Sequence, residues 1–580
     1  MKTFYTAERD AQILIQLMKD HGIKKIVASP GSTNICFVAS VQHDPFFEIY
    51  SSIDERSAAY MACGLAAESG EPVAISCTGA TASRNYMPGL TEAYYRHLPV
   101  LAITSTQSIE RLGHNIPQVV DRTVVPNDLV YLSCRLPMVT NEETEWSCVV
   151  KVNKALLELK RNGGGPVHID LTTEYNTDFS IKELPRVRKI ERYMPGDNFP
   201  KIKNGRIAIF VGSHSQWNGK LVESVEKFCE AYNAVVLCDH TSNYWGNYRI
   251  LPNALCGQIN YRTECAEIDT LIHIGEMSGC YLNISPKNVW KVHKDGELKD
   301  TFRKLENVFE MDENIFFEQY IRGVGPKNTT YYEAWKEECE KLSNNMPEIP
   351  FSNVWVAEQL SSKLPQNSVL HFGILNSLRS WNYFEITKGI NGYCNVGGFG
   401  IDGCVSSLIG ASLANRNRLY FGIVGDLAFF YDMNSLGNRH IASNVRLIIV
   451  NNGRGSEFRN SINWGSMFGD DTDEFISAAR HFGSQSNVLV RHYAEDLGFK
   501  YLSASNKKEF EEESIRFLRT EIRDKPIVFE LFTTPENESE ALEKIVNIES
   551  NASSTAKNMV KGILGTKGTK VLKNIIKNSK

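Results

Sequence analysis

The stretch RLYFGIVGDLAFFYDMNSLGNRHIASNVRLIIVNNG (418–453) has the pattern of a strand, a helix and a second strand. The first strand, expected over 418–426, ends on Gly425-Asp426, and the second, over 445–453, carries Asn451-Asn452. Neighbouring parallel strands end at the same edge of a sheet. We therefore expect Asp426 and Asn452 to lie close together in space.

This pairing suggests a metal site. A carboxylate, an amide oxygen and a nearby backbone carbonyl are hard oxygen ligands of the kind Mg²⁺ prefers, and phosphate oxygens and water complete its shell. The joint pattern predicts a metal–diphosphate site with Mg²⁺. Each residue alone has a purely structural explanation, because Asp426 would also cap its helix and Asn452-Gly453 would also form a turn.

The segment GGFGIDG (397–403) offers a rival interpretation. Its last six residues match GxGxxG, and Asp426 follows at roughly the distance of a ribose-binding acid, as in a nicotinamide or flavin oxidoreductase. Against this, the preceding GYCNV is a weak strand, and the Asn-Asn turn has no role in a dinucleotide site. The glycines still predict close approach of a phosphate-bearing ligand to a helix over 402–414.

Length and composition limit the classes of protein. A chain of 580 residues is too long for one core, and its composition, 42% hydrophobic and 23% charged, is that of a soluble globular protein. The net charge of −5 argues against a nucleic-acid partner. Thirteen cysteines without a CxxC pair predict reduced thiols and a cytoplasmic location.

Helix and strand patterns alternate along most of the chain. This alternation predicts an α/β fold of three open parallel-sheet domains with helices on both faces of each sheet. The expected parts are a first domain at 1–184, a linker at 185–205, a middle domain at 206–330, a linker at 331–350, a third domain at 351–545 and a basic amphipathic tail at 546–580.

With these motifs in view, the chain resembles the thiamine-diphosphate (ThDP)-dependent 2-oxo-acid decarboxylase and carboligase superfamily. Within it, the likeness is nearest to the menaquinone-pathway family that makes 2-succinyl-5-enolpyruvyl-6-hydroxy-3-cyclohexene-1-carboxylate from 2-oxoglutarate and isochorismate. The family motifs APGS, DERG, GASGIDG and GDLSxLYDLN correspond to SPGS (29–32), DERS (54–57), GGFGIDG (397–403) and GDLAFFYDMN (425–434). The likeness covers about residues 1–180 and 350–540.

The resemblance assigns roles to particular residues. It implies that Glu55 contacts N1′ of the aminopyrimidine and activates ThDP, that Asp54 caps the following helix, and that Gln118 lines the substrate side. It also implies cofactor contacts by Asn376, Ser377, Gly400, Ile401, Gly425, Asp426, Leu427 and Asn452, and Mg²⁺ ligation by Asp426, Asn452 and the backbone carbonyl of Arg454. A helix cap at Asn376-Ser377, core packing of Ile401 and a loop amide at Gln118 are the plain alternatives.

The resemblance also implies an assembly. In this superfamily ThDP bridges two subunits, so we expect a homodimer or homotetramer with active sites at the subunit interface. The small residues of the helix over 56–69 would let two such helices pack closely there, and His97 would belong to that interface.

The chain departs from the family at positions where relatives carry substrate-binding arginines. These positions hold Thr33, Gln107 and Val396, and Arg379 is the one guanidinium that the sequence places nearby. We therefore expect the ThDP chemistry to be kept and the substrate pair to differ: a 2-oxo acid with a carbonyl or enone acceptor. A simple decarboxylase and a regulatory protein without turnover are the remaining alternatives.

The last thirty residues carry seven lysines and no acid. Apolar residues recur there at three- and four-residue spacings, which is typical of a basic helix on an anionic membrane surface. A disordered solubilising tail is the alternative. No apolar run in the chain reaches the roughly 20 residues of a transmembrane helix.

Overall fold

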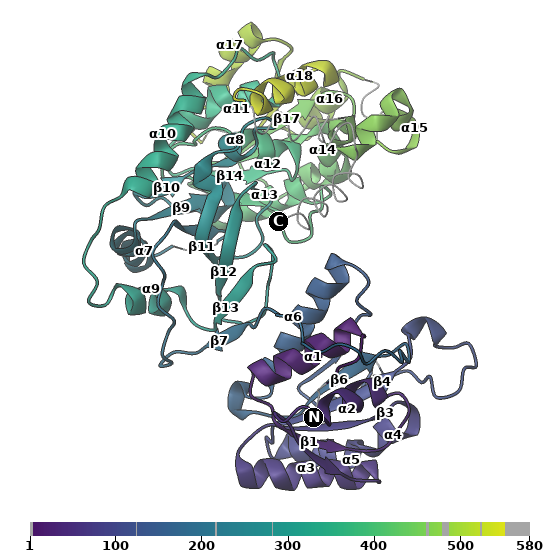
Figure 1. The fold of residues 1–580 in the computed structure, drawn as a ribbon. Coiled ribbons are helices and arrows are strands. Elements are labelled where there is room, and N and C mark those ends of the chain that lie inside the picture. The colour runs from purple at the N-terminus through teal and green to yellow at the C-terminus, as the bar shows by residue number, and fades with distance from the viewer. Residues whose placement is uncertain are drawn as a thin grey trace. The chain divides into compact units, whose positions relative to one another are not determined.

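The computed structural model describes residues 4–550 except 123, 215–216, 281, 460–462, 478–485 and 523–524. The chain divides into two compact units (Figure 1). The first unit holds the residues up to 199 together with 295–310, and the second holds 200–294 and everything from 311 onward. The predicted basic tail lies outside the described residues beyond 550.

The first unit is built on a six-stranded parallel sheet. Its strand order is β2-β1-β3-β4-β6-β5. The strands are β1 Lys25–Ala28, β2 Glu48–Ser51, β3 Val73–Thr78, β4 Val100–Thr106, β5 Leu132–Arg135 and β6 Val167–Thr172. The helices are α1 Arg9–Asp20, α2 Ile35–Val41, α3 Glu55–Ser69, α4 Ala80–Asn85, α5 Met87–Tyr95 and α6 Glu142–Glu158.

Successive strand residues of this sheet face two different cores because side chains alternate across a strand. Ile26 and Ala74 join the apolar cluster under α1, α2 and α6. Their neighbours Val27 and Ile75 join the cluster under α3 and α5. Helices therefore cover both faces of the sheet, as Figure 1 shows, which explains why the central strands β3 and β4 are buried along almost their whole length.

Helix α3 uses its small residues inside its own unit. Ala58, Ala59, Ala62, Cys63 and Ala66 are buried there. A Cβ atom built on Gly89 of α5 would stand 2.4 Å from the Cβ of Ala59, so the two helices are in near-backbone contact. These buried small residues pack against α5, while Tyr60 and Met61 lie on the exposed side. Packing of two α3 helices at a subunit interface stays a prediction.

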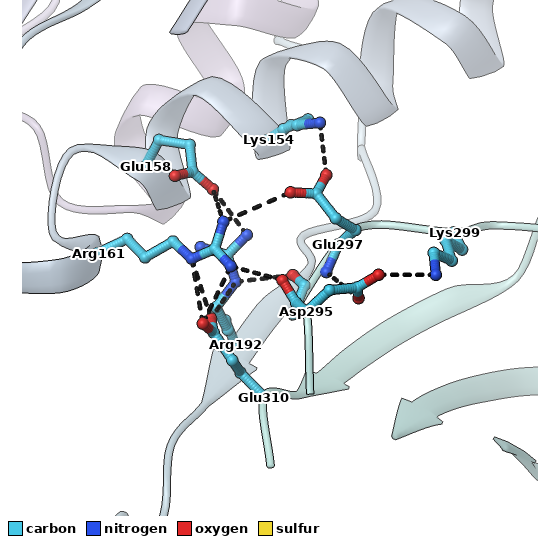
Figure 2. A network of polar contacts seen from close by, with 9 residues as sticks. Lys154, Glu158, Arg161, Arg192, Asp295, Glu297, Lys299 and Glu310 are labelled. Atoms are coloured by element: carbon cyan, nitrogen blue, oxygen red, sulfur yellow. Dashed lines mark hydrogen bonds and ion pairs between the residues drawn. The ribbon is translucent and has the colours of Figure 1, made fainter. Parts of the chain in front are cut away.

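A charged network ties the segment 295–310 to the first unit (Figure 2). Arg161, which follows α6, donates to Glu310 with its Nη2 at 2.9 Å from Oε1 and its Nε at 3.1 Å from Oε2. Arg192 donates to Glu158 at 2.8 Å, and Lys154 donates to Glu297 at 2.6 Å. Strand β13 (Leu305–Phe309) ends just before Glu310 and pairs in parallel with β7 (Glu191–Tyr193). Strand β7 lies inside the segment 185–205 that was expected as a linker.

The second unit contains two parallel sheets, which are the second and third sheets of the chain. The first has the strand order β10-β9-β8-β11-β12. Its strands are β8 Ile207–Val211, β9 Ala234–Cys238, β10 Arg249–Ile250, β11 Glu267–Ile274 and β12 Ser285–Val292, and the accompanying helices are α7 Gly219–Tyr232, α8 Asn253–Cys256, α9 Glu313–Ile321 and α10 Thr330–Asn344.

The third sheet, also in the second unit, has the strand order β15-β14-β16-β17-β19-β18. Its strands are β14 Val369–Phe372, β15 Asn391–Cys394, β16 Tyr420–Gly425, β17 Val445–Asn451, β18 Lys500–Ala504 and β19 Ile527–Phe532. Its helices are α11 Asn353–Leu360, α12 Asn376–Trp381, α13 Cys404–Ala414, α14 Asp426–Asp432, α15 Thr472–Phe475, α16 Leu489–Asp496, α17 Lys507–Phe517 and α18 Pro535–Val546.

The third sheet divides its side chains as the first does. Phe421, Ile423 and Ile448 face one cluster, and Val424 and Leu447 face the other. Three parallel α/β sheets are present, so the predicted fold class is confirmed; the residue bounds of the domains stay predictions. The first three residues of the weak segment GYCNV (392–396) do lie in a strand, β15, which pairs with β14, and Gly392 there approaches the backbone of His240 closely.

Two general features follow. None of the helices in the described part of the chain is long and apolar enough to cross a membrane. All thirteen cysteines are free thiols, and every one is buried or partly buried.

The contact between α3 and α5 generates a stability prediction. We expect Gly89→Ala to lower the thermal unfolding midpoint, because overpacking costs about 1–3 kcal/mol. Gly64→Ala on the open side of α3, where a Cβ would meet nothing within 4 Å, is the matched control and should be neutral or stabilising by up to about 1 kcal/mol. Equal midpoints for the two variants in calorimetry would contradict the packing.

Candidate active site

The edge where β16 and β17 end brings together the residues that the sequence singled out. The two strands pair in parallel with Gly425 opposite Val450. Asp426 and Asn452 therefore leave neighbouring strands at nearly the same height. The strand–helix–strand pattern of 418–453 is confirmed.

Asp426 is an unusual carboxylate. It is the first residue of α14 and is only 2% exposed. Burial raises its pKa to about 7, and the nearby Glu538 acts in the same direction, against the backbone N–H groups of Leu427, Gly453 and Asn452. The N–H of Leu427 donates to its Oδ1 at 2.7 Å. A cation at this point would restore the charged form that burial disfavours.

The two asparagines at the end of β17 have different roles: Asn451 is its last residue and Asn452 follows it. Asn451 is buried and donates its Nδ2 to Glu530 at 2.7 Å, so it belongs to the core behind the sheet. Asn452 is half-buried and accepts the N–H of Arg454 at 3.1 Å, which shapes the turn. Gly453 adopts φ +75°, a conformation that favours glycine and lets this turn form. Asn452 is therefore the one whose side chain lies at the strand ends.

A cavity of about 120 Å³ opens at this edge. Nearly all the predicted cofactor and metal residues of the third domain line it: Asn376, Ser377, Ile401, Gly425, Asp426, Leu427, Asn452 and Arg454. Gly400 does not line it, because its own side of the loop faces Asp402. The structure thus brings the predicted set together from four separate segments.

Residues that the sequence analysis missed also line this cavity. Glu538, near the start of α18, is buried and has its pKa raised to about 7 by burial. It accepts from the Thr533 hydroxyl at 2.8 Å and from the Asn353 N–H at 2.9 Å. Nothing in its local sequence marks it, since it lies 112 residues after Asp426 and 86 residues after Asn452.

The wall formed by α12 holds backbone strain and a neutralised guanidinium. Leu375, just before α12, has φ +68°, which is costly for a branched side chain. Arg379 pairs with both carboxylate oxygens of Glu457 at 3.1 Å and donates to the Asn376 side chain at 2.8 Å. The charge of Arg379, the guanidinium that the sequence placed nearby, is therefore already balanced by Glu457 of this chain.

The dinucleotide interpretation fails on strand order. In a dinucleotide fold, the acid that binds the ribose follows the strand adjacent to the glycine-rich loop. Here β14 lies between β15, which precedes GFGIDG, and β16, which precedes Asp426. Nothing lies within 4 Å of a Cβ built on Gly397 or Gly398, so the loop is not closed around its own chain there.

The first unit presents its own strand ends. Asp54 caps α3 by accepting the N–H of Ser57 at 2.8 Å, as predicted. Glu55 follows as the first helical residue, is half-buried, and accepts from Asn85 at 3.3 Å. It comes after β2, whose last residue Ser51 lies opposite Ala28 of β1, so Glu55 lies at the carboxyl edge of the first sheet.

The remaining predicted positions lie on nearby loops. Gln118 is exposed, with φ +67°, on the loop after β4. His97 contacts the Tyr131 hydroxyl within its own unit. Thr33 is buried, donating to the Ser105 carbonyl at 2.7 Å, and Gln107 donates to the Tyr175 hydroxyl at 2.9 Å. Neither position therefore offers a charged anchor.

The donor set at the third sheet fits a divalent cation bound to a diphosphate. Asp426 supplies one carboxylate, Asn452 an amide oxygen and Arg454 a backbone carbonyl, all hard oxygen donors. The Arg454 side chain itself turns to Asp473 at 3.1 Å. Among the described residues there is no group of three or more His, Cys, Asp or Glu side chains that could hold a metal by themselves.

Comparison with known proteins agrees with this chemistry. The family of thiamine pyrophosphate enzymes, N-terminal TPP binding domain, matches residues 9–124. The 2-succinyl-5-enolpyruvyl-6-hydroxy-3-cyclohexene-1-carboxylate synthases of Phocaeicola vulgatus and Bacteroides thetaiotaomicron are each 30% identical over 560 residues, covering 93% of this chain and 98% of theirs. The synthase of Flavobacterium psychrophilum is 27% identical over 553 residues, covering 90% of this chain and 96% of its own.

The division of labour between Asn451 and Asn452 is testable. We expect Asn451→Ala to destabilise the fold by about 1–3 kcal/mol, because it leaves the buried Glu530 short of a donor. Asn452→Ala should leave unfolding almost unchanged and abolish metal-dependent retention of thiamine pyrophosphate. Thermal unfolding measures the stability and equilibrium dialysis measures cofactor retention. Loss of stability in Asn452→Ala together with loss of cofactor retention alone in Asn451→Ala would contradict this division.

Proposed function

We propose a function from one premise: this chain belongs to the family of 2-succinyl-5-enolpyruvyl-6-hydroxy-3-cyclohexene-1-carboxylate synthases, which are ThDP-dependent enzymes. We infer that it decarboxylates a 2-oxo acid and transfers the resulting carbon unit to a carbonyl or enone acceptor. The observation that carries this inference is the parallel pair β16 and β17, which places Asp426 and Asn452 in one cavity.

The third sheet would hold the diphosphate end of the cofactor. Asp426, Asn452 and the Arg454 carbonyl would ligate Mg²⁺, and Ser377 would donate its hydroxyl to a phosphate oxygen at the start of α12. Ile401, which packs against both apolar clusters of this domain, would contact the rings of ThDP. Once bound, ThDP supplies a thiazolium carbon nucleophile for attack on the 2-oxo group.

Glu55 would act on the other end of the cofactor. Its position at the first turn of α3 fixes its backbone, and Asn85 holds its Oε2. From there its carboxyl group would share a proton with the N1′ nitrogen of the aminopyrimidine, a general acid–base role. Gln118, on its exposed loop, would contact the substrate.

The substrate pair is proposed to differ from that of the named relatives. Thr33 is held by strand ends, Gln107 is held by Tyr175, and Val396 is buried. None of the three offers the charge of the arginine that the family resemblance places there. A simple 2-oxo-acid decarboxylase is the second candidate, because it needs the same cofactor site without a specialised acceptor pocket.

Assembly follows from the same proposal. The cofactor residues are divided between the two units, and relatives of this superfamily join them across subunits. We propose a homodimer, alone or as half of a tetramer, as the smallest active form. Light scattering at assay concentration tests it, and a monomer that turns over substrate would refute it.

The cofactor assignment gives a direct binding prediction. Calorimetry should show saturable binding of ThDP that requires Mg²⁺, and no binding of NAD, because β14 separates the glycine loop from Asp426. With ThDP and Mg²⁺ present, a panel of 2-oxo acids should include at least one that releases CO₂. Tight NAD binding, or no CO₂ release from any 2-oxo acid of the panel, would count against the proposal.

Glu55 gives a kinetic prediction. Glu55→Gln should slow exchange of the C2 proton of bound ThDP by about 10²-fold or more, the scale of a lost acid–base group. Asp54→Asn is the matched control, because asparagine caps a helix as well as aspartate does. NMR measures the exchange, and a wild-type rate in the Glu55 variant would remove Glu55 from this role.

A further inference from the structure

The first sheet contains a buried group of charges that the proposed function does not use. Arg122, from the loop after β4, is 4% exposed, and Asp170 of β6 is 3% exposed. The Nη2 of Arg122 donates to Asp170 Oδ1, and Arg135 of β5 donates its Nε to Asp170 Oδ2 at 2.8 Å. Two guanidinium groups therefore share one carboxylate.

The neighbouring His168 adds no charge to this group. Thr104 donates to Asp170 Oδ1 at 3.1 Å, so its oxygen is left to accept from His168 Nε2 at 2.8 Å. The other ring nitrogen, Nδ1, lies 2.8 Å from the Ser133 hydroxyl. Burial lowers the pKa of His168 to about 4. The imidazole is neutral, and the cluster carries a net charge of about +1.

Three donor atoms of this cluster have no hydrogen-bond partner among the residues that the structure describes. They are Nε and Nη1 of Arg122 and Nη1 of Arg135. An uncompensated buried charge is costly and normally finds a counter-ion or hydrogen-bond partner. Burial lowers the pKa of Arg122, and the guanidinium groups of Arg135 and Arg84 act in the same direction, against the opposite effect of Asp170.

A small cavity adjoins Arg122. Its volume is about 30 Å³, and Arg122, Arg84, His168 and Thr104 line it together with apolar side chains such as Met87 and Leu129. A site needs roughly 10–15 Å³ to admit one water molecule, so this cavity has room for a group the size of one small ion or the head of a carboxylate. It is too small for a whole substrate.

The cluster lies at the functional edge of the sheet. A Cβ built on Gly79, which follows β3, would stand 3.0 Å from Arg122 Nη1 and 3.1 Å from the Ser105 carbonyl. The N–H of Gly79 donates to Thr33 at 3.3 Å. Absence of a side chain at Gly79 therefore leaves Arg122 room at the ends of β3 and β4, the edge from which Glu55 also rises.

We propose that Arg122, oriented by Asp170, is an anion-binding residue at the strand ends of the first sheet, and that its ligand is one small monovalent anionic group. Two sources supply that chemistry: a carboxylate of the substrate, or a free ion such as a halide or formate. The first source rests on the proposed function and makes Arg122 a specificity residue. The second source stands without it.

The test measures anion binding on the full-length protein without cofactor. Sodium bromide and sodium formate are titrated at constant ionic strength against the larger methanesulfonate, and the thermal unfolding midpoint is followed. We expect a saturable rise with bromide and formate. In Arg122→Gln the half-saturating concentration should increase by about tenfold or more, since a hydrogen bond to a charged group is worth at least that factor.

Arg96→Gln is the matched control. Arg96 directly follows α5 and forms an exposed ion pair with Glu92, so this variant removes the same charge from a solvent-exposed position. It should keep the wild-type response. A saturable response that survives unchanged in Arg122→Gln overturns the proposal, as does the absence of any saturable response in the wild type. Neither result depends on ThDP, so failure here is distinct from failure of the proposed function.

A second measurement covers the case in which Arg122→Gln does not fold. Anomalous diffraction from wild-type crystals soaked in bromide should place an ion at Arg122 Nη1 or Nε, and an empty site at saturating bromide overturns the proposal. The source is decided by kinetics with the 2-oxo acid found above. A raised KM with little change in kcat for Arg122→Lys indicates a substrate carboxylate, and an unchanged KM indicates a free ion.

Discussion

The fold depends on one geometric constraint: parallel strands of a single sheet all end at the same edge. A crossover connection returns the chain to the opposite edge before the next strand begins, so polar residues placed just after strands gather without being neighbours in sequence. The third sheet applies this at the point where the order reverses, between β14 and β16. The first sheet applies it between β1 and β3. Helices cover both faces, which leaves the edge as the place where a ligand reaches polar groups.

How far the sequence predicts this arrangement depends on how local each signal is. Asp426 and Asn452 were predictable because each directly follows an apolar strand and one crossover separates them. Asp54 was predictable as a cap because its partner Ser57 is three residues away. Strand β15 was underestimated, since its closure depends on Gly392 approaching His240, a contact 152 residues distant in the chain that no local propensity reports.

The residues that sequence analysis missed share a different property. Glu538 and Arg122 carry charge into the interior, and what makes them important is their surroundings: Thr533 and Asn353 for one, Asp170 for the other. A charge in a sequence is by default a surface residue. Only the folded chain shows that these two are buried. The small residues of α3 show a related limit, because a pattern suited to close packing does not specify the partner helix; within this unit that partner is α5.

The charges that remain at the two edges indicate which ligand groups each edge suits. At the third sheet, Arg379 and Arg454 are balanced by Glu457 and Asp473, while Asp426 and Glu538 are buried carboxyl groups whose pKa values are raised to about 7. That edge has an excess of acid and suits a cation. At the first sheet, two guanidinium groups face one carboxylate, so that edge suits an anion. A metal-bound cofactor at one edge and a carboxylate-bearing substrate at the other would satisfy both excesses. Neither edge needs a further charged side chain for this, so the proposed binding of an acid does not depend on arginines at positions 33, 107 and 396, which hold Thr33, Gln107 and Val396.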